Sequence, residues 1–380
     1  MHDVLIAGAG PAGSVAATIL ARAGARVLLV DRARFPRDKL CGDSINPGTL
    51  ACLRRLGLSA WVDAHGTPID GMLVTGPGGV GVRGRYPDLV QGRTARRRDL
   101  DGHLLTEAAR AGASIDEGVV VRGAVVIGDE GGVARVGGLR VSSRGRREET
   151  VRARVTIAAD GRRSAVTFGL GLARHPPRPR RWALGACFEG VTGTSTFGEM
   201  HIRPGEYIGV APLGDGLTNG CLVTSGRRLA RAGDPAVALR SAIDRDPELG
   251  ERFAGARLVT RPVVLGPLAV ELVGTPGPGL LLAGDAAGFI DPMTGDGLRF
   301  AVRGAELAAE AALAWLESGR VHPSLTHRRH EVFARKWRFN RALRRLVDTP
   351  AAVGAAAWGA SIAPAALRVV IRYAGDCGGG

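Results

Sequence analysis

Hydrophobic positions near the N-terminus follow two spacings that together predict a strand–helix–strand unit. Residues 3–7 form a short apolar run typical of a buried strand, and the apolar positions of 12–23 recur at helical spacing. A second apolar run, 25–30, ends at Asp31. The glycine-rich segment 8–13 lies between the first strand and the helix, where the chain must turn tightly. The chain is therefore expected to begin with a parallel βαβ unit.

Patterning farther along the chain predicts a mixed α/β protein with a second sheet. Helices are expected at 47–56, 98–110 and 297–317, and strands at 119–127, 133–142, 151–158 and 280–283. From 181 to about 224, short strand-like segments separated by glycine turns predict a second, mainly antiparallel sheet. The expected class is α/β with a separate β-rich part and a helical C-terminus.

Composition favours a soluble globular protein. The chain has 380 residues, of which 45% are hydrophobic and 23% are charged, enough for about two to three lobes. The formal net charge is +15, but only Lys39 and Lys336 are lysines, and aromatic residues make up 4%. Nucleic-acid binders usually mix lysine with arginine and add stacking aromatics, so no nucleic-acid partner is expected. The five cysteines form no CxxC pair, so no metal site is expected. Because no signal peptide is recognisable either, we expect a cytoplasmic location.

The glycine-rich turn carries the pattern of a dinucleotide-binding site. Gly8, Gly10 and Gly13 fit GxGxxG, with Ala12 between them, and the turn lies between a strand and a helix. Glycine permits close backbone approach, and the helix N-terminus offers N–H groups to a pyrophosphate. Asp31 ends the second strand, and Arg32 follows it. The separation of Asp31 from the glycine turn along the sequence is the one expected for a carboxylate that binds the adenosine ribose.

A second anion-binding pattern lies near the C-terminal end. A predicted strand leads into Gly284 and Asp285, and a loop with Pro292, Gly295 and Gly297 then enters a long helix. The start of this helix is another place to hold an anion or a polarised ring edge. A nicotinamide dehydrogenase does not need such an element.

These motifs together resemble the FAD-dependent oxidoreductases of the geranylgeranyl reductase and aromatic hydroxylase superfamily, which includes group A flavoprotein monooxygenase-like enzymes. The segment around Asp285 resembles the family's GD motif, Asp160 and Gly161 its DG motif, and Arg97 to Asp101 its Arg-x-x-Leu-Asp segment. The motifs occur in family order over about residues 1–320. The resemblance implies a glutathione-reductase-like, Rossmann-type FAD-binding domain with an inserted antiparallel β-sheet substrate domain and a helical C-terminus. We assign 1–68, 93–180 and 271–325 to the FAD-binding domain, 69–92 and 181–270 to the substrate domain, and 326–380 to the C-terminal helical region.

The resemblance also implies roles for individual residues. The glycine turn and Asp31 would hold the ADP half of FAD, Arg97 would approach the pyrophosphate or ribose, and Asp285 the ribityl or pyrophosphate region. Pro292, Gly295 and Gly297 would bring backbone N–H groups to the isoalloxazine. Two plainer interpretations stay open: Arg97 as a solvated helix start or an ion pair with Asp101, and Asp160 as a turn carboxylate.

The segment Lys39-Leu40-Cys41-Gly42 resembles the Lys-x-Cys-Gly element of the geranylgeranyl-reductase-like branch and of some halogenases. In that branch the cysteine lies near the flavin, so Cys41 is a candidate active-site residue and Gly42 a candidate cofactor contact; a buried inert thiol is the alternative. A halogenase is not expected, because the chain lacks a Trp-x-Trp-x-Ile-Pro segment and both lysines lie outside the region of the required lysine.

A strand of the predicted second sheet offers further catalytic candidates. Tyr207 matches the tyrosine of the reductases' Tyr-x-Trp-x-Phe-Pro strand, but Gly209 and Ala211 replace its bulky residues and leave room for a wider ring system. Before it, His201 and Arg203 share one strand face with Glu199. If this face lines the substrate cavity, His201 could act as acid or base and Arg203 could pair with an anionic group; otherwise it is a solvated outer face.

The expected function is therefore an FAD-dependent oxidoreductase acting on a small hydrophobic substrate, in the reductase-like manner of hydride transfer to a C=C bond. The alternatives are an NAD(P)H-dependent monooxygenase that hydroxylates a phenol or quinol, and a non-catalytic FAD-binding protein. NAD(P)H or a reduced carrier would bind transiently, since no second dinucleotide fold is evident. The basic segment 327–345 predicts either contact with a membrane surface or a helical cap on the substrate domain.

Overall fold

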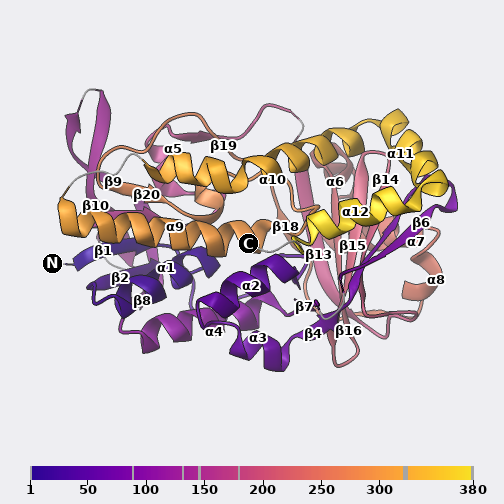
Figure 1. The fold of residues 1–380 in the computed structure, drawn as a ribbon. Helices are drawn as coiled ribbons and strands as arrows, with labels where there is room; N and C mark the ends of the chain where they lie inside the picture. Colours follow the sequence, from indigo (N-terminus) through magenta and orange to yellow (C-terminus); the bar gives the residue numbers. More distant parts are fainter. Residues whose placement is uncertain are drawn as a thin grey trace.

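The chain builds two sheets that lie side by side and are bridged by the C-terminal helices (Figure 1). The computed structural model describes residues 2–87, 90–130, 132–143, 147–178, 180–319 and 324–377. The first sheet is formed by the N-terminal strands together with β20, which arrives from late in the sequence.

The first sheet is centred on β1 (His2–Ala7), which pairs in parallel with strands on both sides. Its members in spatial order are β8 (Ser114–Glu117), β2 (Val27–Asp31), β1, β11 (Glu149–Ala158), β10 (Val133–Ser143) and β9 (Val119–Glu130), with β20 (Leu280–Leu282) also pairing with β11. The pairings of β2 with β8 and of β11 with β20 are parallel, whereas β9, β10 and β11 form an antiparallel meander. The predicted βαβ start and meander are both confirmed.

Alternating residues of β1 divide between two apolar layers. Val4 and Ile6 pack under the helices of one face, whereas Leu5 and Ala7 pack on the other face with the meander. The helices of the first face are α1 (Pro11–Arg22), α2 (Pro47–Arg55), α3 (Ala60–His65), α4 (Arg97–Arg110) and α9 (Gly297–Ser318). The short α5 (Ala165–Gly169) lies against β9 on the opposite face.

Small side chains let α9 pack closely against α1. Ala305, Ala308 and Ala312 recur on one stripe of α9 and are fully buried. At the start of α2, Asn46 caps the helix by accepting a hydrogen bond from the Thr49 N–H at 2.9 Å, as its position before a proline predicts. These contacts hold α9 against α1 and fix the start of α2.

The second sheet is mainly antiparallel, as predicted, and it draws on two distant parts of the sequence. Its strands in spatial order are β17 (Arg257–Leu258), β13 (Arg181–Glu189), β16 (Leu217–Ser225), β15 (Glu206–Gly214), β14 (Phe197–Arg203), β5 (Gly71–Thr75) and β6 (Gly81–Arg85), with β18 (Val263–Leu265) pairing with β13. The exception is β5, which pairs with β14 in parallel. Shorter pairings elsewhere involve β3 (Ser44–Ile45), β7 (Gly92–Thr94), β4 (Thr67–Ile69), β12 (Ala173–Arg174) and β19 (Glu271–Leu272).

One face of the second sheet is covered by short helices. Leu184, Ile208 and Leu222 of this face pack with Leu239 and Phe253 in one apolar cluster. The covering helices are α6 (Gly226–Ala232), α7 (Pro235–Asp244) and α8 (Gly250–Phe253). The other face of the sheet is therefore left to form the wall of a cavity.

The C-terminus is helical, which confirms the last part of the predicted fold class. α10 (Ser324–Asp348) lies along α9 and continues over the second sheet, where α11 (Pro350–Ile362) and α12 (Pro364–Ala374) fold back (Figure 1). α12 packs on β6, and α11 contacts the short turn η1 (Pro77–Gly79). The chain thus closes one side of the space between the two sheets.

Candidate functional site

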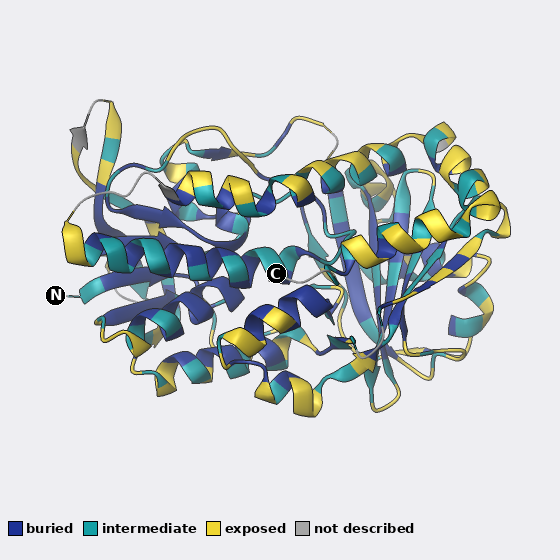
Figure 2. Ribbon diagram, in the orientation of Figure 1, coloured by how far each residue is buried: buried dark blue, intermediate teal, exposed yellow. Residues whose placement is uncertain are grey.

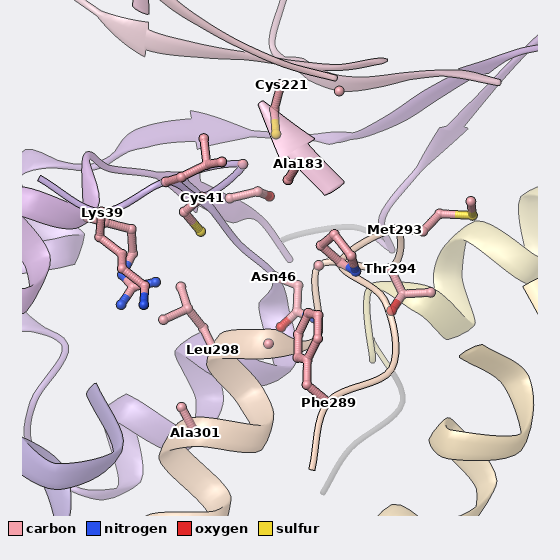
Figure 3. Close-up of a pocket in the computed structure, with 18 of the residues that line it drawn as sticks. Lys39, Cys41, Asn46, Ala183, Cys221, Phe289, Met293, Thr294, Leu298 and Ala301 are labelled. Atoms are coloured by element: carbon pink, nitrogen blue, oxygen red, sulfur yellow. The ribbon is translucent and has the colours of Figure 1, made fainter. Parts of the chain in front are cut away.

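A cavity of about 600 Å³ lies between the two sheets and is lined by both. All residues predicted for the FAD site except Gly13 line it: Gly8, Gly10, Ala12, Asp31, Arg32, Cys41, Gly42, Arg97, Asp160, Gly161, Gly284, Asp285, Pro292, Gly295 and Gly297. The second sheet adds an apolar wall with Met72, Val74, Ala183, Met200, Ile202 and Cys221. Figure 3 shows Cys41 and Cys221 on the sheet side and Leu298 and Ala301 on the α9 side.

Glycine is present at the three positions of the first turn for different structural reasons. Gly8 has a φ of +95°, and a Cβ there would lie 2.6 Å from the Ala159 carbonyl oxygen. A Cβ on Gly13 would lie 1.8 Å from the Gly8 carbonyl oxygen, so Gly13 is needed for the turn itself and not for the cavity surface. A Cβ on Gly10 would meet only the Arg37 side chain, at 3.6 Å. Gly10 therefore leaves open the backbone surface that a pyrophosphate approaches.

Asp31 joins the glycine turn to the end of β2. One carboxylate oxygen accepts a hydrogen bond from the Ala9 N–H at 2.7 Å, and the other from the Ala33 N–H at 2.8 Å. Each oxygen retains a lone pair that can accept a hydrogen bond from a ribose hydroxyl. The carboxylate both holds the turn and lines the cavity, which is the arrangement predicted for a ribose ligand.

Unpartnered polar atoms in the cavity wall fit FAD. Asp160 accepts a hydrogen bond from the Ala165 N–H at 2.8 Å through one oxygen, while its other oxygen is buried without a partner. The Thr294 hydroxyl is also buried without a hydrogen-bond partner. Buried polar atoms rarely lack partners unless a ligand or water supplies them. Together with the open backbone at Gly10, these atoms are suited to a ligand with phosphates, hydroxyls and a polar ring edge.

The loop from Asp291 to Asp296 is anchored at both ends by buried carboxylates. The Tyr207 hydroxyl donates to Asp291 at 2.6 Å, and the Met293 N–H donates to the same carboxylate at 3.1 Å. Arg181 approaches the other Asp291 oxygen at 3.7 Å. Tyr207 does not line the cavity, so the structure makes it a support for this loop and not the group in contact with substrate that we expected.

Asp296 anchors the other end of the loop, just before α9. Its carboxylate accepts hydrogen bonds from Asn46 at 3.3 Å, from Lys336 at 3.4 Å and from Asn340 at 3.4 Å, and all four side chains are buried. Lys336 belongs to the basic segment 327–345, for which membrane contact or a helical cap was expected, and its side chain turns inward. The loop and the N-terminus of α9, where Gly297 and Leu298 line the cavity, are therefore held in place by α10.

Cys41 and Arg97 meet at the junction of the two halves of the cavity. Arg97 is bound through two hydrogen bonds, at 2.7 and 2.9 Å, to the buried carboxylate of Asp101. The ion pair considered from the sequence is thus present, at a buried position that also lines the cavity. Burial raises the pKa of the Cys41 thiol, although the hydrogen bond from Arg97 acts in the opposite direction. The thiol therefore keeps its proton near neutral pH.

The sequence interpretation missed several groups around this junction. Lys39 lines the cavity, although in the sequence its position served only as an argument against a halogenase. Burial lowers the pKa of Lys39 to about 8, and the nearby charge of Arg97 acts in the same direction. Asp43 accepts hydrogen bonds from the Asn219 side chain and the Arg97 N–H. Burial raises the pKa of Asp43 to about 6. The sequence signal for both residues was their position: Lys39 is the lysine of the Lys-x-Cys-Gly segment, and Asp43 directly follows that segment.

Arg162 was also missed as a residue of the cavity wall. Its guanidinium is 3.7 Å from Asp285, lies over the Phe289 ring and lines the cavity. Its position directly after the Asp160-Gly161 pair was the available signal.

The structure corrects the expectation for His201 and Arg203. Both lie on the face of β14 that points away from the cavity, because Met200 and Ile202 occupy the cavity face. His201 is fully buried between Thr75 and Glu199, with ring nitrogens 2.9 Å from each partner. His201 and Arg203 therefore do not line the cavity, although Glu199 of the same face borders it, and the face is not a solvated surface.

The partners of this polar face come from the covering helices. Arg252 of α8 binds both Glu199 oxygens, at 2.7 and 2.8 Å, and Arg203 pairs with Asp246 at 2.9 Å. These charges neutralise one another inside the fold. The geometry leaves His201 and Arg203 no access to a molecule in the cavity.

Comparisons with known proteins agree with this geometry. Residues 1–213 match the family model described as FAD binding domain. A menaquinone reductase from Mycolicibacterium smegmatis is 32% identical over 332 residues, which is 81% of this chain and 75% of the relative. A digeranylgeranylglycerophospholipid reductase from Methanopyrus kandleri is 31% identical over 333 residues, 86% of this chain and 80% of the relative. The flavin-dependent brominase Bmp2 matches with a TM-score of 0.83 at 22% identity, over 99% of this chain and 94% of the brominase, which shows a shared fold.

Proposed function

We propose, because this chain belongs to the family of FAD-binding oxidoreductases that includes menaquinone and digeranylgeranylglycerophospholipid reductases, that it reduces a carbon–carbon double bond in a small hydrophobic substrate. The observation that carries the proposal is a single cavity in which an FAD-type cradle faces an apolar wall. Bound FAD would supply hydride transfer to the double bond. The two electrons would come from NAD(P)H or a reduced carrier that binds transiently.

Cys41 is our candidate for the proton donor of this reaction. Alkene reduction adds a hydride to one carbon and a proton to the other, and Cys41 holds a proton at Sγ on the wall of the cavity. The adjacent Arg97 guanidinium stabilises the thiolate that remains after proton transfer. Solvent then returns a proton to Sγ, so the overall reaction consumes one hydride and one proton for each double bond.

The wall of the cavity favours a substrate that combines a ring with an alkene. Gly209 and Ala211 both line the cavity, and a Cβ on Gly209 would meet its nearest atoms only at 3.9 Å. This space would admit a wide ring system. Menaquinone, which the name of one relative specifies, joins a quinone ring to an unsaturated chain. A lipid of that kind is the substrate class we propose.

Anaerobic turnover tests the reaction type. The purified flavoprotein, reduced without oxygen, is mixed with a quinone that carries an unsaturated side chain, and both flavin absorbance and product mass are followed. We expect the flavin to be reoxidised by the substrate without oxygen, and the product to gain two hydrogen atoms. The Cys41→Ala variant should retain FAD but reduce the substrate at least about tenfold more slowly, whereas Cys187→Ala serves as a control outside the cavity lining.

A monooxygenase that hydroxylates a phenol or quinol is the second candidate. The room left by Gly209 and Ala211 is the observation that favours it. In the same experiment, a product that gains oxygen, formed only when oxygen is admitted, would establish this alternative against the reductase. Protein that binds FAD but shows neither reaction with any such substrate would favour a non-catalytic role.

A further inference from the structure

The fold leaves an apolar surface exposed on the α11–α12 hairpin. Trp358 is 70% exposed, Ile362 63% and Val369 66%, the highest exposures among the large hydrophobic residues that the structure describes. Figure 2 shows exposed residues along both helices. Within the described chain, no single helix is long and apolar enough to cross a membrane; Ala351–Ile362 and Pro364–Ala374 qualify together, but they are bent by 111° at their junction.

α12 separates this exposed surface from the cavity. Leu367, Val370 and Ile371 on its inner side line the cavity. Val369 points outward on the opposite side and is exposed. Tyr373 is 40% exposed, but its ring packs edge-on against Phe339 of α10, with the ring centroids 4.9 Å apart. α12 alone therefore separates the apolar end of the cavity from the environment of the outer surface.

The α11–α12 hairpin carries charge of one sign. No Asp or Glu occurs from residue 349 to 375, while Arg368 and Arg372 are exposed on α12. On the preceding helix, Lys336 and Arg329 are buried. Arg338, Arg341 and Arg345 of that helix remain exposed, as do its two acidic residues, Glu331 and Asp348. Exposed arginines together with the exposed Trp358 complement the phosphates and apolar boundary of an anionic bilayer.

We propose that the α11–α12 hairpin lies in the interface of an anionic membrane and that lipid-soluble substrate passes beside α12 into the cavity. The sharp bend between the two helices suits a hairpin that lies in the plane of the interface. A second copy of the chain is a poorer occupant, because two such positive surfaces repel each other. Membrane binding stands independently of the proposed reaction, whereas the passage of substrate rests on the proposed function.

The test is flotation of the FAD-loaded, full-length protein with lipid vesicles, with flavin absorbance measured in the vesicle fraction. Vesicles of phosphatidylcholine alone are compared with vesicles containing about one-third phosphatidylglycerol. One variant removes apolar contacts, Trp358→Ser with Ile362→Ser; a second removes charge, Arg368→Gln with Arg372→Gln. The matched control, Val126→Ser with Ile127→Ser, alters a distant pair that is 52% and 49% exposed.

We expect the apolar variant to lower the partition coefficient on anionic vesicles at least about tenfold. The charge variant should lower it by about tenfold on anionic vesicles at low salt and leave binding to phosphatidylcholine unchanged. The control and Trp358→Phe, which keeps an apolar ring, should bind like the wild type. Flavin content and melting temperature, measured for every variant, separate lost binding from lost folding.

Wild-type protein that does not float with anionic vesicles would overturn the proposal, as would equal losses in the control and the apolar variant. Self-association without vesicles that disappears in the apolar variant would assign the surface to a second copy instead. Because flotation needs no turnover, an enzyme that binds vesicles but reduces no alkene would contradict the proposed function and leave the membrane site standing.

Discussion

The two halves of the cavity are built by different means. On the cofactor side, backbone shape positions the groups: Gly8 and Gly13 permit a turn that other residues would block. On the substrate side, polar and charged side chains that are wholly or largely buried hold the frame, as Glu199, His201 and Arg252 do behind β14. A site made by backbone leaves a local sequence motif, whereas a site framed by side chains depends on partners far away in the sequence.

The two designs also respond differently to substitution. A side chain added where backbone atoms already touch cannot be accommodated without moving the chain. A buried ion pair can be lost at a measurable cost in stability, because the remaining charge is left without its partner. Substitutions at the glycine turn and behind β14 should therefore have distinguishable effects.

The largest effect is expected at the glycine turn. In Gly13→Ala the new Cβ would lie 1.8 Å from the Gly8 carbonyl oxygen, so the turn cannot form as observed. We expect a loss of more than about 4 kcal/mol in the free energy of unfolding and no retained FAD. In Gly10→Ala the Cβ has room, and we expect a folded protein with FAD affinity weakened by roughly tenfold or more.

Thermal melting and flavin absorbance of the purified variants check this pair. Equal melting temperatures for Gly13→Ala and the wild type would contradict the steric role of Gly13. Full FAD content in Gly10→Ala at limiting FAD would contradict the close approach of the pyrophosphate to this position.

The buried network behind β14 should give the next largest effect. Glu199→Gln leaves Arg252 without its carboxylate, and we expect the free energy of unfolding to fall by about 3 kcal/mol while FAD stays bound. Urea unfolding measures the loss. Arg54→Gln, which breaks an exposed pair with Asp63, is the control and should change stability little.

The loss in Glu199→Gln should also depend on pH. Burial by itself raises the pKa of Glu199, but the hydrogen bond from His201 and the Arg252 guanidinium outweigh it and hold the pKa below its ordinary value. A carboxyl with a lowered pKa stabilises the fold above its unfolded pKa of about 4.5, and this contribution disappears as pH falls through the folded value. The gap between wild type and variant should therefore close in acid. A gap that is constant down to the acid transition would show that the charge of Glu199 is not involved.

The sequence predicted the first sheet and the cofactor cradle well because their signals are local. The apolar spacing of residues 12–23 specifies a helix, and the glycines before it specify a turn, without knowledge of any distant contact. The long helix over 297–317 was predicted within one residue of Gly297–Ser318 for the same reason. The fold class followed from the order of these elements.

The facing of β14 could not be predicted from its own residues. Alternation shows that Glu199 and His201 share one face, but not whether this face meets the cavity. That choice depends on Arg252, which arrives some 50 residues later in a covering helix. The inward turn of Lys336 toward Asp296 is a similar case, since residues within a basic run give no local sign of a buried partner.

The third largest effect is expected at Asp43, where substitution should raise the free energy of unfolding instead of lowering it. Burial raises the pKa of Asp43 to about 6, from an ordinary value of 3.8. Between these values the folded protein keeps a proton that the unfolded chain has lost, so this group lowers stability as pH rises through that window. The full shift corresponds to about 3 kcal/mol. Asp43→Asn removes the titration, and the unpartnered Asn219 amide oxygen can turn to accept from the new amide.

We therefore expect Asp43→Asn to be about 2 kcal/mol more stable than the wild type at pH 7 and nearly equal to it at about pH 4. Urea unfolding of the FAD-loaded proteins at both pH values measures this. Asp38→Asn, at an exposed neighbouring carboxyl, is the control. The same pH slope in wild type and Asp43→Asn would show that another group titrates in this range.

The smallest effect is expected at the boundary between the two halves, where Tyr207 of the second sheet supports the cofactor loop. Tyr207→Phe removes the 2.6 Å hydrogen bond to Asp291 but leaves the Met293 N–H and Arg181 beside that carboxylate. We expect the free energy of unfolding to fall by about 1–2 kcal/mol, with a small shift of the flavin absorbance spectrum. Burial raises the pKa of Tyr207 well above its ordinary value, so the hydroxyl stays protonated and the loss should not vary with pH between 6 and about 9. Tyr373→Phe, an exposed tyrosine, should change neither quantity. A loss as large as that of Glu199→Gln would mean that the loop from Asp291 to Asp296 depends on side-chain contacts as strongly as β14 does. The contrast between a cofactor half built by backbone and a substrate half framed by side chains would then not hold for this loop.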